Sequence, residues 1–131
     1  DTVMPGYLAY DFGDAMRTLI NTAAEDEKEL DRINLNIPFF EAYTKGYLKN
    51  AAGFISVGEI ESLSAGMLIM PYMQSIRFLT DHLNGDVYYK ILFPGHNLQR
   101  TRSQMELLRK LDEQMPAIEE IIRESASICF R

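Results

Sequence analysis

The densest group of side chains that could bind a ligand begins at Arg77. Two carboxylates follow this guanidinium, Asp81 and Asp86, with an Asn-Gly turn between them. Two phenols, Tyr88 and Tyr89, come next. Fixed polar groups at the end of an apolar element are what a site for a small polar ligand requires. A structural alternative has Arg77 and Asp81 as a surface ion pair one helical turn apart and the tyrosines as core residues. Residue types alone leave both interpretations open, with the structural one slightly ahead.

Phosphoryl transfer would need a phosphate cradle, a basic side chain, a carboxylate for the acceptor hydroxyl and ligands for Mg²⁺. The chain contains neither G-x-x-x-x-G-K-[ST] nor G-x-G-x-x-G, and neither histidine begins a His-x-Asp motif. Asp11-Phe12-Gly13 spells the metal-binding tripeptide of protein kinases, but a helix cap at Asp11 and close packing at Gly13 explain it better. We therefore expect the chain by itself not to transfer phosphate.

The histidines and the cysteine are poor candidates for a reactive site. His82 and His96 lack the spacing of zinc ligands and are expected to be polar loop residues. Cys129 has no base near it in sequence, so packing or a terminal tail explains it better than a nucleophile. No metal site is predicted from these three residues.

Apolar residues at helical spacing predict an all-α, bundle-like domain of five or six helices that occupies residues 1–131. Capping residues predict where four of these helices begin, and proline at the first helical position predicts the fifth. The predicted starting signals are Asp11, Asn36 with Pro38, Ser56 with Glu59, Asn97, and Pro116.

The segment from Ala65 to Leu83 is apolar nearly all round, which predicts a buried central helix. Pro71 is expected to kink or divide this helix because proline lacks the backbone N–H. Val87 to Phe93 is a short β-prone run before Pro94-Gly95, and we expect an extended loop or a small hairpin there.

The net charge of -6 argues against nucleic-acid and anionic-membrane partners, because those surfaces are bound by clustered Lys and Arg. The longest apolar run, Met67 to Met70, is far shorter than the roughly 20 residues that span a bilayer. One cysteine permits no internal disulfide, which favours a reducing, cytoplasmic compartment. The start at Asp1, within a tight loop, leads us to expect a fragment of a longer protein.

Five separated blocks of the chain form a recognisable series: Asp1–Gly6, Tyr10–Arg17, Phe40–Tyr47, Arg77–Tyr88 and Gly95–Arg100. In order and spacing they resemble successive blocks of bacterial N-acetylhexosamine 1-kinases, which belong to the aminoglycoside phosphotransferase superfamily. The resemblance implies a protein-kinase-like fold with ATP and Mg²⁺ between two lobes and the sugar held by a helical C-terminal part.

The same resemblance implies roles for individual residues. Arg77, Asp86 and Tyr88 fall where relatives contact the hexosamine. Asp11 falls where an aspartate steadies the catalytic loop, and Asp1 lies next to the Mg²⁺ site. The main metal ligand and the catalytic aspartate would lie upstream, so the nucleotide lobe and the catalytic loop are absent from this chain. The expected function is sugar binding for phosphate transfer to the anomeric hydroxyl, with catalysis requiring the remainder of the kinase chain.

Two alternatives remain at this point. A stand-alone helical binding or interaction module would keep the fold without the chemistry. Some relatives are labelled mucin-desulfating enzymes, but common sulfatases need Cys-x-Pro-x-Arg, and Cys129 is followed by Phe130-Arg131. We also expect a face that would pack against the remaining kinase to drive homodimerisation. That face comprises Val3, Met4, Tyr7 and Leu8.

Overall fold

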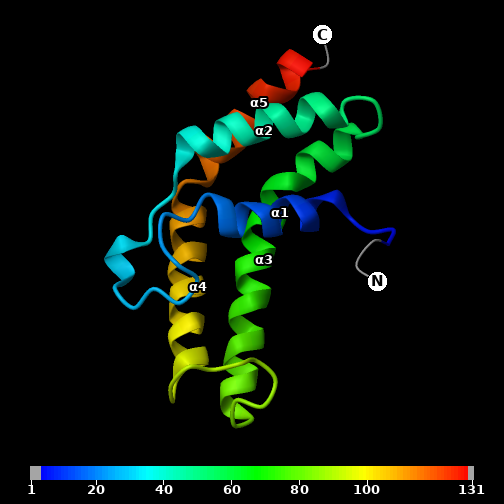
Figure 1. The fold of residues 1–131 in the computed structure, drawn as a ribbon. Helices are drawn as coiled ribbons and strands as arrows, with labels where there is room; N and C mark the ends of the chain where they lie inside the picture. Colours follow the sequence, from blue (N-terminus) through cyan, green and yellow to red (C-terminus); the bar gives the residue numbers. More distant parts are fainter. Residues whose placement is uncertain (1–3, 130–131) are drawn as a thin grey trace.

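The computed structural model describes residues 4–129 and confirms the predicted all-α class. This part of the chain contains five α-helices, one short 3-10 helix and no β-strand (Figure 1). None of its helices has the length and apolar character that crossing a membrane would require. The elements are α1 (Leu8–Leu19), η1 (Leu30–Arg32), α2 (Ile37–Ala51), α3 (Val57–Leu83), α4 (His96–Glu113) and α5 (Met115–Cys129).

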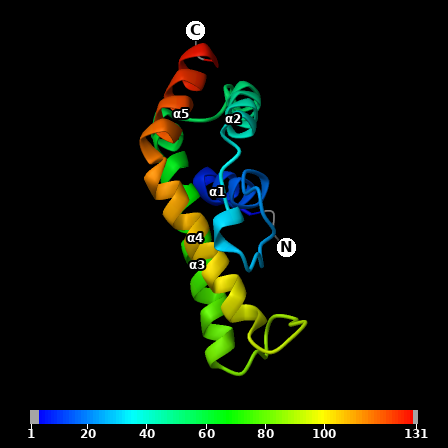
Figure 2. The same ribbon diagram turned by 90° about the vertical axis from the view of Figure 1, so that its left-hand side faces the viewer.

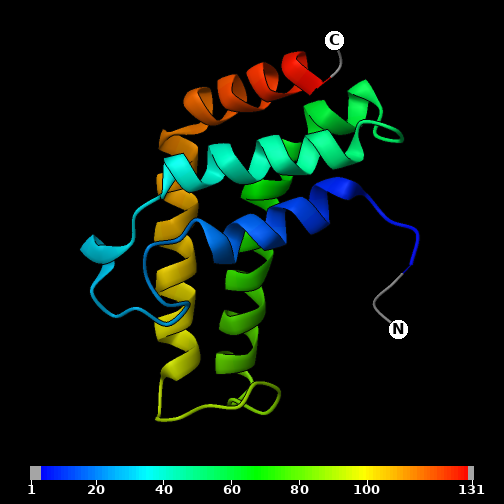
Figure 3. The ribbon, with the colours of Figure 1, turned by 45° about the horizontal axis from the view of Figure 1, so that its top comes forward.

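Two long helices, α3 and α4, pack side by side as an antiparallel pair, and the other helices are arranged around this pair (Figure 1). Helix α1 crosses this pair, and α2 lies between α1 and α5 (Figure 3). Figure 2 shows that α1 and α2 lie on one side of the α3–α4 pair. The core between these layers includes Phe12 from α1, Phe40 from α2 and Met67 from α3.

Helices α1 and α3 touch backbone to backbone through two glycines. A Cβ atom on Gly66 would lie 1.9 Å from the carbonyl oxygen of Ala9, and one on Gly13 would lie 2.2 Å from the carbonyl oxygen of Gly66. Real Cβ atoms do not approach other atoms so closely, so only glycine permits this crossing. The close packing predicted for Gly13 is therefore confirmed.

Helix α3 begins with the predicted capping box. Ser56 accepts a hydrogen bond from the Glu59 backbone N–H, and the Glu59 carboxylate accepts one from the Ser56 N–H. Pro71 does not divide the helix, which is continuous from Val57 to Leu83. The first turns of α3 run obliquely to the remainder (Figure 1), which agrees with the predicted kink of a proline-containing helix.

Besides Ser56, one further predicted cap is confirmed and two are wrong. The Asn36 side chain accepts from the Phe39 N–H at 3.1 Å, as a cap should. Helix α1, however, starts three residues before Asp11, which lies exposed in its first turn. Helix α4 starts after Gly95, whose φ of 83° suits glycine, and the Asn97 side chain is used elsewhere. The run from Val87 to Phe93 is an extended loop without strand pairing.

Candidate functional site

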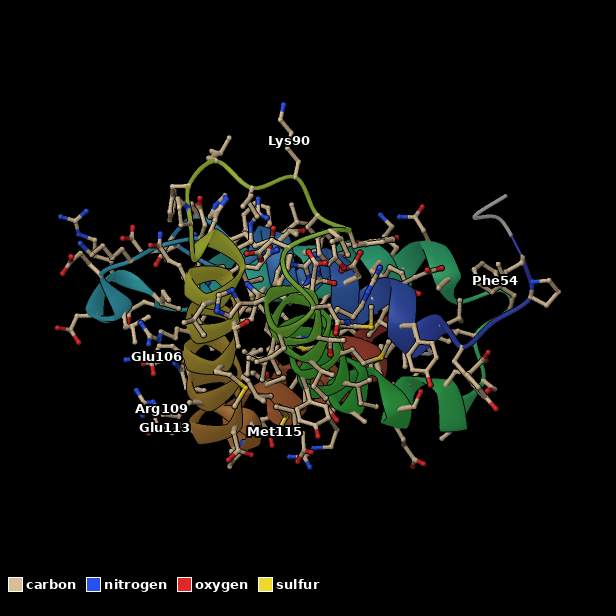
Figure 4. All side chains as sticks on the ribbon, turned by 90° about the horizontal axis from the view of Figure 1, so that it is seen from below. Phe54, Lys90, Glu106, Arg109, Glu113 and Met115 are labelled. Carbon is tan, nitrogen blue, oxygen red and sulfur yellow. The ribbon has the colours of Figure 1, made fainter. Side chains whose placement is uncertain are left out.

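The candidate site is the α3–α4 loop, residues 84–95, which joins the two long helices at the end of the molecule farthest from α5 (Figure 1). The loop begins with the predicted Asn84-Gly85 turn, where Gly85 has a φ of 90°. Seen from below, the loop spans the ends of both helices and Lys90 projects away from the protein (Figure 4). Three buried polar side chains, Asp81, Asn97 and His96, and the half-buried Arg100 determine the shape of this loop.

Asp81, near the C-terminal end of α3, fixes the loop because its carboxylate accepts hydrogen bonds from backbone N–H groups of the loop. One carboxylate oxygen accepts from the Val87 and Tyr88 N–H groups at 3.0 and 2.8 Å. The other accepts from the Tyr89 N–H at 2.9 Å and from the Asn97 amide at 2.8 Å. Burial raises the pKa of Asp81, but these four hydrogen bonds outweigh burial and hold its pKa below the ordinary value. Asp81 is therefore a charged structural anchor.

Asn97 links Asp81 to Asp86. Its side chain is fully buried, and its amide nitrogen also donates to a carboxylate oxygen of Asp86 at 2.9 Å. The other Asp86 oxygen lies 3.5 Å from Nδ1 of His82, and only 14% of the Asp86 side chain is exposed. Asp86 has a φ of 58°, a left-handed conformation that aspartate tolerates better than most residues. The carboxylate of Asp86 thus points mainly into the protein.

Arg100 completes the inner side of the loop. Its guanidinium donates to the Asn97 side-chain oxygen at 3.0 Å and to the Lys90 carbonyl oxygen at 3.2 Å. The same group lies over the Phe78 ring, 5.3 Å from the ring centre. Arg100 therefore joins the polar network of the loop to the aromatic residues of α3.

His96 fixes the far end of the loop. It is buried at the start of α4, which corrects the expectation of a polar loop histidine. Its Nδ1 accepts from the Leu92 N–H at 3.2 Å, so Nε2 carries the proton and donates to Asp26 at 2.8 Å. The hydrogen bond from His96 is the main cause that lowers the pKa of Asp26. This contact ties the segment between α1 and α2 to α4.

The outer face of the loop is aromatic and cationic. Tyr89 packs on Phe78, with ring centres 4.8 Å apart. The Arg77 guanidinium lies 5.6 Å from the centre of the Tyr89 ring, and Tyr88 contacts the same ring edge-on at 4.8 Å. Tyr88 itself is 74% exposed. Arg77 and Tyr88 therefore flank Tyr89 with their polar ends free to meet a ligand.

The structural alternative is wrong for the Arg77–Asp81 pair and for Tyr88, whereas Tyr89 is half-buried against Phe78. Asp81 is buried and accepts from the loop backbone, so it is no surface partner of Arg77. Tyr88 is exposed, so it does not fill the core. Of the residues predicted to contact the sugar, Arg77 and Tyr88 lie on one outer face, while Asp86 binds Asn97 within the loop.

Sequence reasoning missed the structural roles of Asp81, Asn97 and Arg100. A signal for the first was present, because aspartate side chains commonly accept backbone N–H groups beside a turn, and Asn84-Gly85 follows three residues later. The role of Asn97 depends on the two helix ends meeting, which a one-dimensional pattern does not reveal.

Metal-ligating side chains do not gather in the part of the chain that the structure describes. Between residues 4 and 129 no three His, Cys, Asp or Glu side chains come close enough together to hold a metal ion. Asp1, predicted to lie next to Mg²⁺, is outside the described residues. Asp11 is exposed in the first turn of α1, where a negative charge complements the helix dipole. Compared with models of known protein families, the chain matches none.

Proposed function

We propose that this chain is the sugar-binding helical part of an ATP-dependent phosphotransferase that acts on the anomeric hydroxyl of N-acetylhexosamines. The observation that supports this most is the α3–α4 loop, whose backbone is fixed from inside by Asp81. A loop held in this way presents Tyr88 beside Arg77 of α3 at low conformational cost, which favours binding of a small polar ligand.

Each outer residue suits one part of a sugar. The Arg77 guanidinium donates hydrogen bonds to ring, hydroxyl or acetamido oxygens. The Tyr88 ring gives a flat apolar face for the C–H side of a pyranose, and its hydroxyl adds a polar contact. Asp86 accepts from a sugar hydroxyl through the small part of its carboxylate that Asn97 and His82 leave accessible, and it also keeps the loop in shape.

The phosphate-transferring groups belong, in this proposal, to the remainder of the kinase chain. That part would supply the ATP and Mg²⁺ sites and the catalytic aspartate, because the residues described here hold no suitable cluster of metal ligands. Asp11, at the exposed start of α1, would steady the catalytic loop from this side. Such an enzyme would act in the cytoplasm, where ATP is available.

The test is steady-state kinetics of a polypeptide that contains both kinase lobes. Arg77→Ala or Tyr88→Ala should lower kcat/KM for the sugar about ten- to hundredfold, a loss of roughly 1–3 kcal/mol, because each removes a contact to the acceptor. The KM for ATP should stay unchanged. Lys90→Ala is the matched control, since Lys90 belongs to the same loop but projects away from the protein (Figure 4). Unchanged sugar kinetics in both Arg77 and Tyr88 variants would contradict the proposal.

A binding module without catalysis is the second candidate, and one further feature favours it. A groove of about 730 Å³ lies between the first turns of α3 and helix α5, with mainly apolar walls that include Val57, Ile60 and Ile122.

Titration of N-acetylglucosamine followed by backbone amide NMR separates the two candidates. Shifts confined to residues 77–90 support sugar binding, whereas no shifts there favour the module.

A further inference from the structure

Helix α3 carries a continuous apolar stripe that faces away from its own core. The stripe residues follow one another at alternating spacings of three and four, which is the heptad pattern of helices that pair with another helix. Its five large residues are between 37% and 76% exposed. We call this set the α3 seam: Ala65, Ile69, Tyr72, Ile76, Leu79 and Leu83.

The seam lies opposite the side of α3 that is buried. Met67, Pro71, Ser75 and Phe78 face the interior, where α1 and α4 pack. Figure 2 shows α1 and α2 together on one side of the long helices. Met73 of α3 and Met105 of α4, which are 44% and 46% exposed, widen the apolar area beside the seam. The solvent-facing side of a helix is normally polar, so an exposed apolar stripe of this length is typical of a surface that binds another protein.

We propose that the α3 seam binds the α3 seam of a second copy of this chain. A symmetric dimer brings the same patch of both copies together, and a heptad stripe is complementary to itself. The exposed parts of the seam and the two flanking methionines offer about 700 Å² per copy, close to the roughly 800 Å² per partner of a standard stable interface. This inference is independent of the proposed sugar site.

Charge also favours a second copy as the partner. The whole chain has a net charge of -6, so most of its surface would repel another copy. The α3 seam contains no ionisable side chain other than the phenol of Tyr72, and the exposed α3 residues Met73 and Thr80 beside it are uncharged. The one buried carboxylate of this part of α3, Asp81, points to the loop. Two seams can therefore meet without bringing carboxylates together.

The test is sedimentation velocity of the chain over a wide concentration range. The wild-type chain should sediment as a dimer of twice the 15.0 kDa chain mass. The double variant Ile76→Glu/Leu79→Glu should raise the dissociation constant at least about hundredfold, because four carboxylates would be buried in the dimer. Circular dichroism should show unchanged helix content, since both side chains point away from the core.

A matched control separates this seam from the face predicted at the N-terminal end. There Met4 and Tyr7 are 70% and 75% exposed, Leu8 packs partly against the core, and Val3 lies outside the described residues. Tyr7→Glu should leave the α3 dimer intact. A wild-type chain that stays monomeric, or a dimer that Tyr7→Glu dissociates and the seam variant does not, would overturn the proposal. If the double variant unfolds, Ile76→Ser serves in its place and must weaken the dimer.

Discussion

Asp81 and Asn97 show how two buried polar residues can specify a loop that has no secondary structure. The Asp81 carboxylate accepts three successive backbone N–H groups, and Asn97 joins it to Asp86. Buried polar groups that are fully paired in this way fix one conformation, because any other would leave a charge or an amide unpaired. The loop therefore depends on residues that a ligand does not touch.

Replacement of Asp81 should lower the stability of the protein by an amount that depends on pH. Asp81→Asn keeps the size of the side chain but loses the charge and one acceptor, and it should lower Tm at neutral pH by roughly 5–10 °C. The folded-state pKa of Asp81 lies below its ordinary value of 3.8. Its contribution to stability is therefore complete above that value and is lost as pH falls through the lower folded-state pKa.

Thermal unfolding of both proteins across the acid range measures this effect. The difference in Tm between wild type and Asp81→Asn should be constant near neutral pH, should shrink below 3.8 and should vanish in stronger acid. A difference that grows on acidification would contradict the assignment of Asp81 as a charged anchor.

Asp86 has a positive φ and a hydrogen bond from Asn97, and two variants of Asp86 test what these features contribute to stability. Asp86→Asn keeps an acceptor for Asn97 and tolerates the left-handed conformation, so it should cost less than about 0.5 kcal/mol. Asp86→Ala loses both advantages and should lower the free energy of unfolding by about 1–3 kcal/mol. Urea denaturation of the two variants checks this order, and equal losses would show that the contact with Asn97 contributes little.

At the scale of the helices, the crossing of α1 and α3 depends on the two glycines at its centre. Gly66→Ala would place a Cβ against the backbone of Ala9, which cannot move aside as a flexible side chain would. We expect a loss of about 2–4 kcal/mol because the helices must separate. Gly46→Ala is the control, since its Cβ in α2 would meet nothing within 4 Å, and it should stabilise the protein by about 0.5–1 kcal/mol. Similar effects of both changes would refute this account.

Helix boundaries were predictable where the signal was local. The caps at Asn36 and Ser56 were correct because each side chain bonds to a backbone N–H three residues away. The cap at Asn97 was wrong because its amide binds two carboxylates near the end of α3 and in the loop that follows. The cap predicted at Asp11 was wrong because α1 begins three residues earlier, at Leu8, which packs partly against the core.

For the whole molecule, the class and number of helices followed from hydrophobic spacing, while their arrangement did not. Nothing in the local pattern indicates that Gly13 and Gly66 meet, or that α2 lies between α1 and α5. Arg77, Tyr88 and Tyr89 do lie together beside the end of α3, but the inward direction of Asp86 depends on Asn97 of α4, which no local pattern reveals.

We expect the isolated chain not to phosphorylate a sugar. Incubated with ATP, Mg²⁺ and N-acetylglucosamine, it should give no sugar-dependent ADP release above a buffer control. The physical reason is that the described residues contain no cluster of metal ligands, and the sequence contains no phosphate-binding glycine motif. A coupled ADP assay measures this, and turnover that depends on the sugar would disprove it.

The hydrogen bond between His96 and Asp26 has a consequence for the order in which the protein folds. It joins residues 70 positions apart, whereas Asp81 and Asn97 are separated by 16. In an unfolded chain the longer closure costs about 1.3 kcal/mol more. The α3–α4 hairpin should therefore form before the segment that precedes α2 docks on it. Asp26→Ala should then speed unfolding and leave the refolding rate almost unchanged.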